Sequence, residues 1–140
     1  MPNVPQKIRV LITEDDLDAR ELLCLYLTHQ NFQVAPVDNG EDALRLASEQ
    51  QFDAYLLDNR LPEISGLELC KRIRQFDSDT PIIFYSGDGD PSHKDEAFQA
   101  GAQGYVVKPA SCEEVLNTIL AVVEVKSNTS VGPDSGVRVG

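Results

Sequence analysis

Four short apolar runs, each followed by a charged or hydroxyl side chain, constrain what this chain can fold into. The runs lie at residues 8–13, 54–57, 82–85 and 105–107, and they are followed by Glu14 with Asp15, Asp58, Ser86 and Lys108. Nearly continuous apolar runs between helix-like segments are typical of buried strands in a parallel sheet. The carboxyl ends of such strands open on one edge, where ligands bind. We therefore expect these side chains to meet in one crevice, suited to a divalent metal and a phosphoryl group.

Five strand-like segments alternate with five helix-like segments. The expected strands are Ile8–Thr13, Gln33–Val37, Ala54–Asp58, Pro81–Ser86 and Gly104–Lys108. The expected helices are Leu17–Gln30, Gly40–Glu49, Gly66–Gln75, Ser92–Ala100 and Cys112–Val125. Strict alternation predicts an α/β fold with a doubly wound parallel sheet, two helices on one face and three on the other.

Several helix ends have recognisable signals. Ser111 lies three residues before Glu114, which is the spacing of a capping box for the last helix. Asn39 precedes the second helix, Pro91 precedes the fourth, and Gly101 ends the fourth.

Length and composition indicate one soluble globular domain. A chain of 140 residues can bury a core without disulfides or metal staples. No apolar stretch approaches the ~20 residues that cross a bilayer, and the N-terminus lacks the layout of a signal peptide. We therefore expect a cytoplasmic location and no membrane partner. Cys24, Cys70 and Cys112 have no metal-binding spacing and are interpreted as buried free thiols.

The charge of the chain argues against direct binding of nucleic acid. The net charge is −11, whereas nucleic-acid binders carry a basic stripe. Lys71, Arg72 and Arg74 form the only basic cluster, and Glu68 and Asp77 flank it. We interpret this cluster as a solvated helix face, and the acidic surface favours cationic partners.

Five motifs, in order and at matching intervals, give the chain a family resemblance. They are V-L-I-T-E-D-D, D-N-G-E-D-A-L, L-L-D-N-R-L-P-E-I-S-G, I-I-F-Y-S-G and G-A-Q-G-Y-V-V-K-P. Together they resemble the receiver domain of two-component response regulators, the CheY-like family. The resemblance implies a flavodoxin-like three-layer sandwich of five strands in the order 2-1-3-4-5 and five helices.

The expected domain boundaries follow this resemblance. The receiver domain is expected over residues 7–126, after a short N-terminal tail at residues 1–6. Residues 127–140 are rich in Ser and Gly and show no periodicity, so we expect a flexible tail or linker there.

The resemblance also implies a role for each residue at the expected crevice. Asp58 matches the phosphoacceptor, and Lys108 matches the lysine that supplies positive charge to the phosphoryl oxygens. Glu14 and Asp15 match the acidic pair that holds Mg²⁺. Asp58 and the backbone carbonyl of Arg60 complete the protein ligands that the resemblance implies.

Further family positions concern the switch that responds to phosphorylation. Ser86 matches the switch hydroxyl, and Tyr105 matches the aromatic switch position on the fifth strand. The family usually has a cis bond between the residues that match Lys108 and Pro109. Asp16 is expected at the start of the first helix, where its charge meets the helix dipole favourably, and not at the metal site.

The resemblance implies a signalling switch and not an enzyme, with only self-phosphorylation and self-dephosphorylation chemistry. A sensor histidine kinase or a phosphotransfer protein would donate to Asp58. The fourth helix, fifth strand and fifth helix would then change and regulate a downstream protein target, with a phosphorylation-dependent homodimer as one form. On the first helix, Leu22 and Leu25 lie beside the expected core face, so they are candidate kinase contacts, with ordinary burial as the alternative.

Arg60 and Asp88 carry opposite charges two residues after Asp58 and Ser86. In the family these positions flank the path of the water that attacks the acyl phosphate. We hypothesise that Arg60 and Asp88 pair as a gate that slows hydrolysis, the alternative being two independent solvated charges.

Two other classes of protein compete with this interpretation. A haloacid-dehalogenase-like phosphohydrolase also has a nucleophilic aspartate after a strand, and residues 16–18 offer a superficial D-x-D. However, no acidic strand end follows Lys108, and the chain has no room for a cap. The other alternative is a receiver fold used as a constitutive binding module, against which the complete set of site residues argues.

Overall fold

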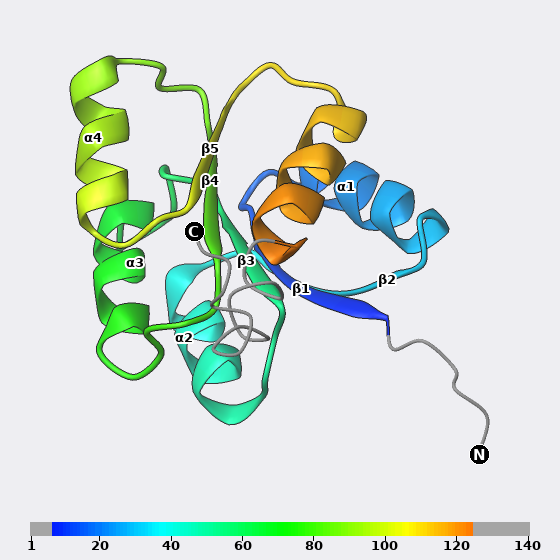
Figure 1. The fold of residues 1–140 in the computed structure, drawn as a ribbon, viewed down its shortest axis with the longest axis horizontal. Helices are drawn as coiled ribbons and strands as arrows, with labels where there is room; N and C mark the ends of the chain where they lie inside the picture. Colours follow the sequence, from blue (N-terminus) through cyan, green and yellow to red (C-terminus); the bar gives the residue numbers. More distant parts are fainter. Residues whose placement is uncertain (1–6, 125–140) are drawn as a thin grey trace, which may run out of the picture.

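The computed structural model describes residues 7–124, in which strands and helices alternate (Figure 1). The elements are β1 (Ile8–Thr13), α1 (Leu17–His29), β2 (Phe32–Val37), α2 (Gly40–Glu49), β3 (Ala54–Leu57), α3 (Gly66–Arg74), β4 (Ile82–Ser86), α4 (Pro91–Gln99) and β5 (Gly104–Val107). Residues 112–124 form a further helix, called here the last helix. The tails expected at residues 1–6 and 127–140 lie outside the described residues. Between residues 7 and 124, no helix has the length and apolar character needed to cross a membrane.

The strands of the described chain form one parallel sheet in the order β2-β1-β3-β4-β5, which confirms the predicted fold class and strand order. The register explains why distant residues meet. Thr13 of β1 pairs with Leu57 of β3, so Glu14 and Asp58 leave adjacent strands at the same level. In the same way, Ser86 of β4 pairs with Val107 of β5.

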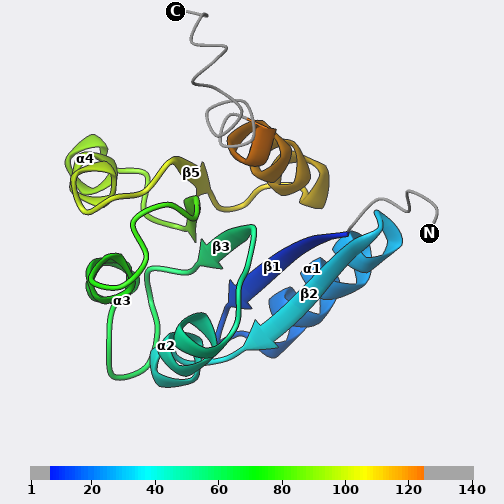
Figure 2. The ribbon, with the colours of Figure 1, turned by 60° about the horizontal axis from the view of Figure 1, so that its bottom comes forward.

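The helices cover the sheet in the predicted division of two and three (Figures 1 and 2). Helices α2, α3 and α4 pack on one face through a buried cluster that includes Ala43, Leu69 and Ala97. Helix α1 and the last helix pack on the other face, where Leu23 and Val115 are buried. Alternate strand side chains supply the two clusters, as expected for a sheet buried on both faces.

Side-chain caps fix where most helices begin. Asp16 accepts a hydrogen bond from the Ala19 amide at 2.9 Å, which confirms that it belongs to the start of α1. Asn39 and Ser111 accept from the amides three residues on. Helix α4 begins one residue earlier than predicted, because Asp90 is the cap and its carboxylate is followed by a proline at the first helical position.

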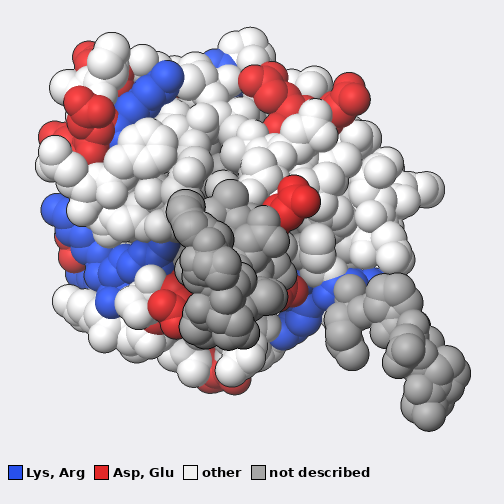
Figure 3. Space-filling view, in the orientation of Figure 1, with Lys and Arg blue, Asp and Glu red and all other residues white. Residues whose placement is uncertain are grey.

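The predicted solvated face of α3, formed by Lys71, Arg72 and Arg74, is correct for two of these residues and wrong for Arg74. Lysine and arginine side chains gather over this helix (Figure 3), and Lys71 and Arg72 are exposed as predicted. Arg74 is instead half-buried. Its guanidinium donates to the Gly101 carbonyl at 2.7 and 3.1 Å, to the Asp77 carbonyl at 2.9 Å and to the side chain of Gln103 at 2.9 Å. This side chain therefore fastens the C-terminal end of α4 to α3.

The cysteines are free, as predicted, but they differ in burial. Cys70 is fully buried against the α2–α4 side of the sheet, whereas Cys24 and Cys112 are only half-buried. The prediction of buried thiols is thus correct for Cys70 alone.

Candidate functional site

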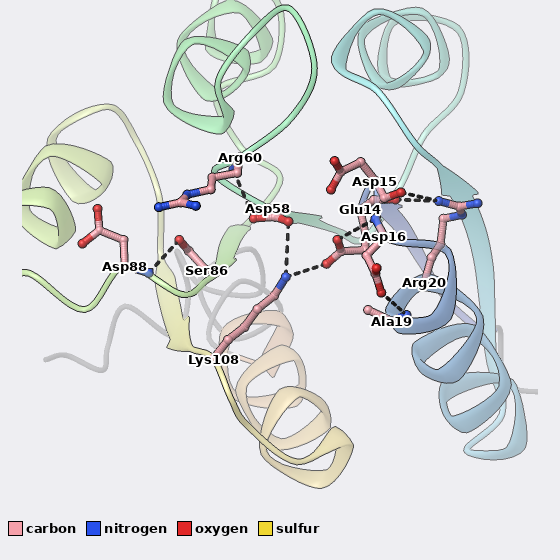
Figure 4. Close-up of polar contacts among 10 residues, drawn as sticks. All are labelled: Glu14, Asp15, Asp16, Ala19, Arg20, Asp58, Arg60, Ser86, Asp88 and Lys108. Carbon is pink, nitrogen blue, oxygen red and sulfur yellow. Dashed lines mark hydrogen bonds and ion pairs between the residues drawn. The ribbon is translucent and has the colours of Figure 1, made fainter.

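Three carboxylates meet at the carboxyl edge of the sheet (Figure 4). Glu14 and Asp15 follow β1, Asp58 follows β3, and one oxygen from each carboxylate lies within 4.8 Å of the others. Glu14 and Asp58 are buried, with 1% and 6% of their surface exposed, whereas Asp15 is exposed. The structure therefore brings the predicted acidic residues together and leaves one of them accessible from solvent.

Lys108 reaches this cluster from the end of β5. Its Nζ lies 2.8 Å from Oε1 of Glu14 and 3.2 Å from Oδ2 of Asp58. The peptide bond to Pro109 is cis, as the resemblance implied. Three carboxyl groups gather here with one ammonium, an arrangement that favours the binding of a cation.

The electrostatic environment shifts the pKa of two of these groups. Burial raises the pKa of Glu14, and the nearby charge of Asp58 adds to this effect, while Lys108 opposes it. Burial alone would lower the pKa of Lys108, but its hydrogen bond to Glu14 and the charge of Asp58 raise the net value above the ordinary one. The ammonium is therefore held in its charged form, as an electrostatic role requires.

Backbone contacts fix the loop that presents Glu14 and Asp15. The Asp58 amide donates to the Thr13 carbonyl at 3.0 Å, which ties the two strand ends together. The Asp16 amide donates to the Glu14 carboxylate at 3.0 Å. Arg20 donates to the Glu14 carbonyl at 2.8 Å and more weakly to the Asp15 carbonyl at 3.5 Å. The contacts of Arg20 could not be predicted from the sequence, because an arginine in a first helical turn is ordinarily solvated.

The donor set fits Mg²⁺ by its chemistry. Carboxylate oxygens are the hard ligands that Mg²⁺ takes in proteins, and it keeps several waters when it binds, which the exposure of Asp15 permits. The amide of Arg60 donates to Oδ1 of Asp58 at 3.1 Å, so this residue lies beside the cluster. The role of the Arg60 carbonyl as a ligand stays a prediction.

The two expected switch residues contact the same loop residue, Asp88. Ser86 is buried, and its hydroxyl accepts a hydrogen bond from the Asp88 amide at 3.1 Å. The Tyr105 hydroxyl donates to the Asp88 carbonyl at 2.5 Å, and its ring stacks on Phe84 with centroids 5.8 Å apart. The loop that leads into α4 is therefore held from both positions.

The expected ion pair between Arg60 and Asp88 is not found within residues 7–124. The Asp88 carboxylate instead contacts Nδ1 of His93 on α4, and this hydrogen bond raises the pKa of His93. The Asp88 carboxylate is thus paired with the first turn of α4 in place of Arg60, and a joint effect of Arg60 and Asp88 on hydrolysis stays a prediction.

Leu22 and Leu25 are 58% and 60% exposed, while Leu23 and Leu27 on the same helix are buried. The alternative of ordinary burial is therefore wrong for Leu22 and Leu25. Their proposed contact with a kinase stays a prediction.

Comparison with known proteins identifies the family. A family model described as the response regulator receiver domain matches residues 10–120. The chain belongs to this family. Receiver domains are the phosphoacceptor switches of two-component signalling, so the function predicted from the sequence is confirmed at this level, and the haloacid-dehalogenase alternative is wrong.

Relatives of known function resemble this receiver domain over nearly its whole length. The transcriptional regulatory proteins ResD of Bacillus subtilis (strain 168) and SrrA of Staphylococcus aureus (strain NCTC 8325 / PS 47) are each 34% identical to it over 122 residues. The matches cover 87% of this chain and 50% of each relative. The chain thus spans about half the length of these regulators.

Solved structures agree with the fold. A CheY-like receiver domain from Methanospirillum hungatei JF-1 has a TM-score of 0.85 at 21% identity, covering 89% of this chain and 99% of that one. The receiver domain of a sensor histidine kinase from Pseudomonas aeruginosa PAO1 has a TM-score of 0.78 at 26% identity, covering 85% and 99%. That structure holds a magnesium ion coordinated in its active site cleft.

Proposed function

We propose that Asp58 accepts a phosphoryl group from a sensor histidine kinase or a phosphotransfer protein, with Mg²⁺ as cofactor. The observation that carries this proposal is the setting of the Asp58 carboxylate. It is buried, 3.2 Å from the Lys108 ammonium and within 4.8 Å of oxygens from Glu14 and Asp15. Such a site offers a nucleophile, a fixed positive charge and ligands for a divalent cation.

The chemistry requires mainly positioning and neutralisation of charge. An oxygen of Asp58 forms a bond to phosphorus while the bond between phosphorus and the donor breaks, and the leaving group takes that electron pair. Lys108 then donates to a phosphoryl oxygen. Glu14, Asp15, Asp58 and the Arg60 carbonyl would hold Mg²⁺, which supplies further positive charge to the phosphoryl oxygens.

The output of this chemistry is a change of the face formed by α4, β5 and the last helix. Ser86 and Tyr105 both contact Asp88 in the loop before α4, so a new acceptor for the Ser86 hydroxyl would alter that loop. Phe98 on α4 and Leu120 on the last helix are 45% and 40% exposed, which supports contact with a protein target or a second copy. We propose that this switch works in the cytoplasm as a signalling domain and not as an enzyme.

The kinase side of the proposal concerns α1. Leu17, Leu22 and Leu25 are each more than half exposed, although leucine is ordinarily buried on a helix that covers a sheet. An apolar surface on the helix that follows Asp15 suits a protein that must bring its phosphoryl group to Asp58. We therefore propose Leu22 and Leu25 as kinase contacts.

The test uses acetyl phosphate as a small donor. With Mg²⁺, the intact mass of the wild-type chain should increase by one phosphate, and the increase should be absent in Asp58→Asn and in the presence of EDTA. An equal adduct in Asp58→Asn would refute the assignment. No adduct in the wild type would instead support a receiver fold that works as a constitutive binding module.

A further inference from the structure

The ammonium of Lys108 has a third contact, with the ring of Tyr85. Its Nζ lies 4.7 Å from the ring centroid, in addition to its hydrogen bonds with Glu14 and Asp58. A cation within about 6 Å of an aromatic centroid is attracted by the negative face of the ring. Because the Lys108 side chain is only 25% exposed, water screens this attraction incompletely.

The fold places Tyr85 at this position. Tyr85 directly precedes Ser86 on β4, so the two side chains point to opposite faces of the sheet. Tyr85 pairs in register with Val106 of β5, two residues before Lys108. Its ring packs with the half-buried side chains around the cluster between the sheet, α1 and the last helix. The lysine that leaves β5 therefore passes beside this ring.

The ring, and not the hydroxyl, is the part of Tyr85 that contacts the site. Among residues 7–124, no hydrogen bond is found for the Tyr85 hydroxyl, whereas the hydroxyls of Tyr55 and Tyr105 each have a partner. The contact of the Lys108 ammonium with the Tyr85 ring is thus an interaction that Tyr85 makes in addition to its packing in the core.

We propose that Tyr85 is a positioning residue for phosphoryl transfer, whose aromatic face holds the Lys108 ammonium at Asp58. This proposal rests on the proposed function of Asp58. When phosphoryl oxygens arrive, the ammonium must exchange a carboxylate acceptor for a phosphoryl acceptor. A hydrogen bond is directional and is lost in such an exchange, but attraction to a ring face tolerates a small displacement. Tyr85 keeps the ammonium in place while its acceptors change.

The experiment measures the rate of phosphorylation by acetyl phosphate at saturating Mg²⁺. Tyr85→Leu removes the ring and should lower the rate about fivefold, whereas Tyr85→Phe keeps the ring and should restore most of it. Tyr26→Leu is the matched control, because Tyr26 is a half-buried tyrosine packed against the same cluster that has no contact with Lys108 among the described residues. Tyr26→Leu should leave the rate unchanged.

A graded series separates the electrostatic role from a packing role. Phenylalanine analogues with one, two and three ring fluorines at position 85 withdraw electron density from the ring face with little change of shape. The rate should fall stepwise along this series, and the affinity for Mg²⁺ should stay constant, since Tyr85 is not part of the acidic cluster.

The outcomes distinguish this proposal from the proposed function. If the wild type is phosphorylated but the fluorinated series has a constant rate, or Tyr85→Leu matches the wild type, the role of Tyr85 is refuted alone. If the wild type takes up no phosphoryl group, both proposals fail together. A loss of rate in Tyr26→Leu equal to that in Tyr85→Leu would assign the effect to core packing.

Discussion

Replacing Lys108 by methionine removes the cation that contacts the buried carboxylates while it keeps most of the apolar stem. Within the described residues, Lys108 makes the only ion pairs of Glu14 and Asp58, at 2.8 and 3.2 Å. Removing one partner of a fully buried pair costs ~3–5 kcal/mol. Because the Lys108 side chain is 25% exposed, we expect a smaller loss, about 2–3 kcal/mol in the free energy of unfolding near neutral pH without metal.

The loss should decrease as the pH falls, because Glu14 can take up a proton. Burial raises the pKa of Glu14 above its ordinary value of 4.5, and Lys108 lowers it, so the pKa rises further in Lys108→Met. A carboxyl with a raised pKa in the folded state contributes stability that is fully present below 4.5 and is lost as the pH rises through the folded pKa. Lys108→Met should therefore lie closer to the wild type at mildly acidic pH than at neutral pH.

Urea unfolding in EDTA, followed by circular dichroism at the two pH values, measures both effects. A loss of this size shifts the midpoint by about 1 M, given slopes of ~1–3 kcal/mol per M for small proteins. Lys71→Met is the matched control, since it makes the same change of charge on the exposed face of α3 and should cost less than ~0.5 kcal/mol. An equal loss in Lys71→Met, or a loss in Lys108→Met that is independent of pH, would refute the reasoning.

Three further results are expected. Mg²⁺ at a hundredfold excess over its Kd should stabilise the wild type by ~2.7 kcal/mol in thermal melts. Asp15→Ala should lose most of this stabilisation by Mg²⁺. If Mg²⁺ stabilises Asp15→Ala as much as the wild type, Asp15 is not part of the metal site. Gly66→Ala should lower the Tm, because an added Cβ would lie 2.4 Å from the carbonyl oxygen of Asp58 and such overpacking costs about 1–3 kcal/mol. Gly87→Ala should leave the Tm unchanged, because an added Cβ there meets no atom within 4 Å. Equal Tm values for the two variants would mean that the loop at Gly66 relaxes. In a double-mutant cycle, the effects of Arg60→Ala and Asp88→Ala on the dephosphorylation rate should be additive, since the Asp88 carboxylate contacts His93 and not Arg60. Non-additive effects would support the hypothesis of a coupled gate.

The fold and the convergence of the site were predictable because they depend on patterns that a sequence carries directly. Apolar runs mark buried strands, and in a parallel sheet their carboxyl ends share one edge whatever the loops do. The level at which Glu14 and Asp58 meet then follows from the pairing of Thr13 with Leu57. Errors in the strands were confined to single residues at their ends.

Contacts that depend on the orientation of a single side chain were not predictable from the sequence. The pattern that marks Tyr85 as a strand residue says nothing of the cation over its ring. The partner of Asp88 depends on where α4 begins, and the combination of Asp90 with Pro91 is the signal that would have placed that start correctly. Arg74 looked solvated because charge on a helix usually is, whereas it satisfies carbonyls at the end of another helix.

The hydrogen bonds from Arg74 to the Gly101 carbonyl fix the C-terminal end of α4 against α3, so a tilt of α4 would turn about that end. With nine residues, α4 is about 13 Å long, so a tilt of about 10° around Gly101 displaces its first turn by roughly 2 Å. Phe98, near the fixed end, hardly moves in such a tilt. His93 and Lys94, near the N-terminal end, would move most, and they contact Asp88 and the ring of Tyr105. A tilt of α4 would therefore be largest beside the loop that Ser86 and Tyr105 contact, and smallest at Gly101.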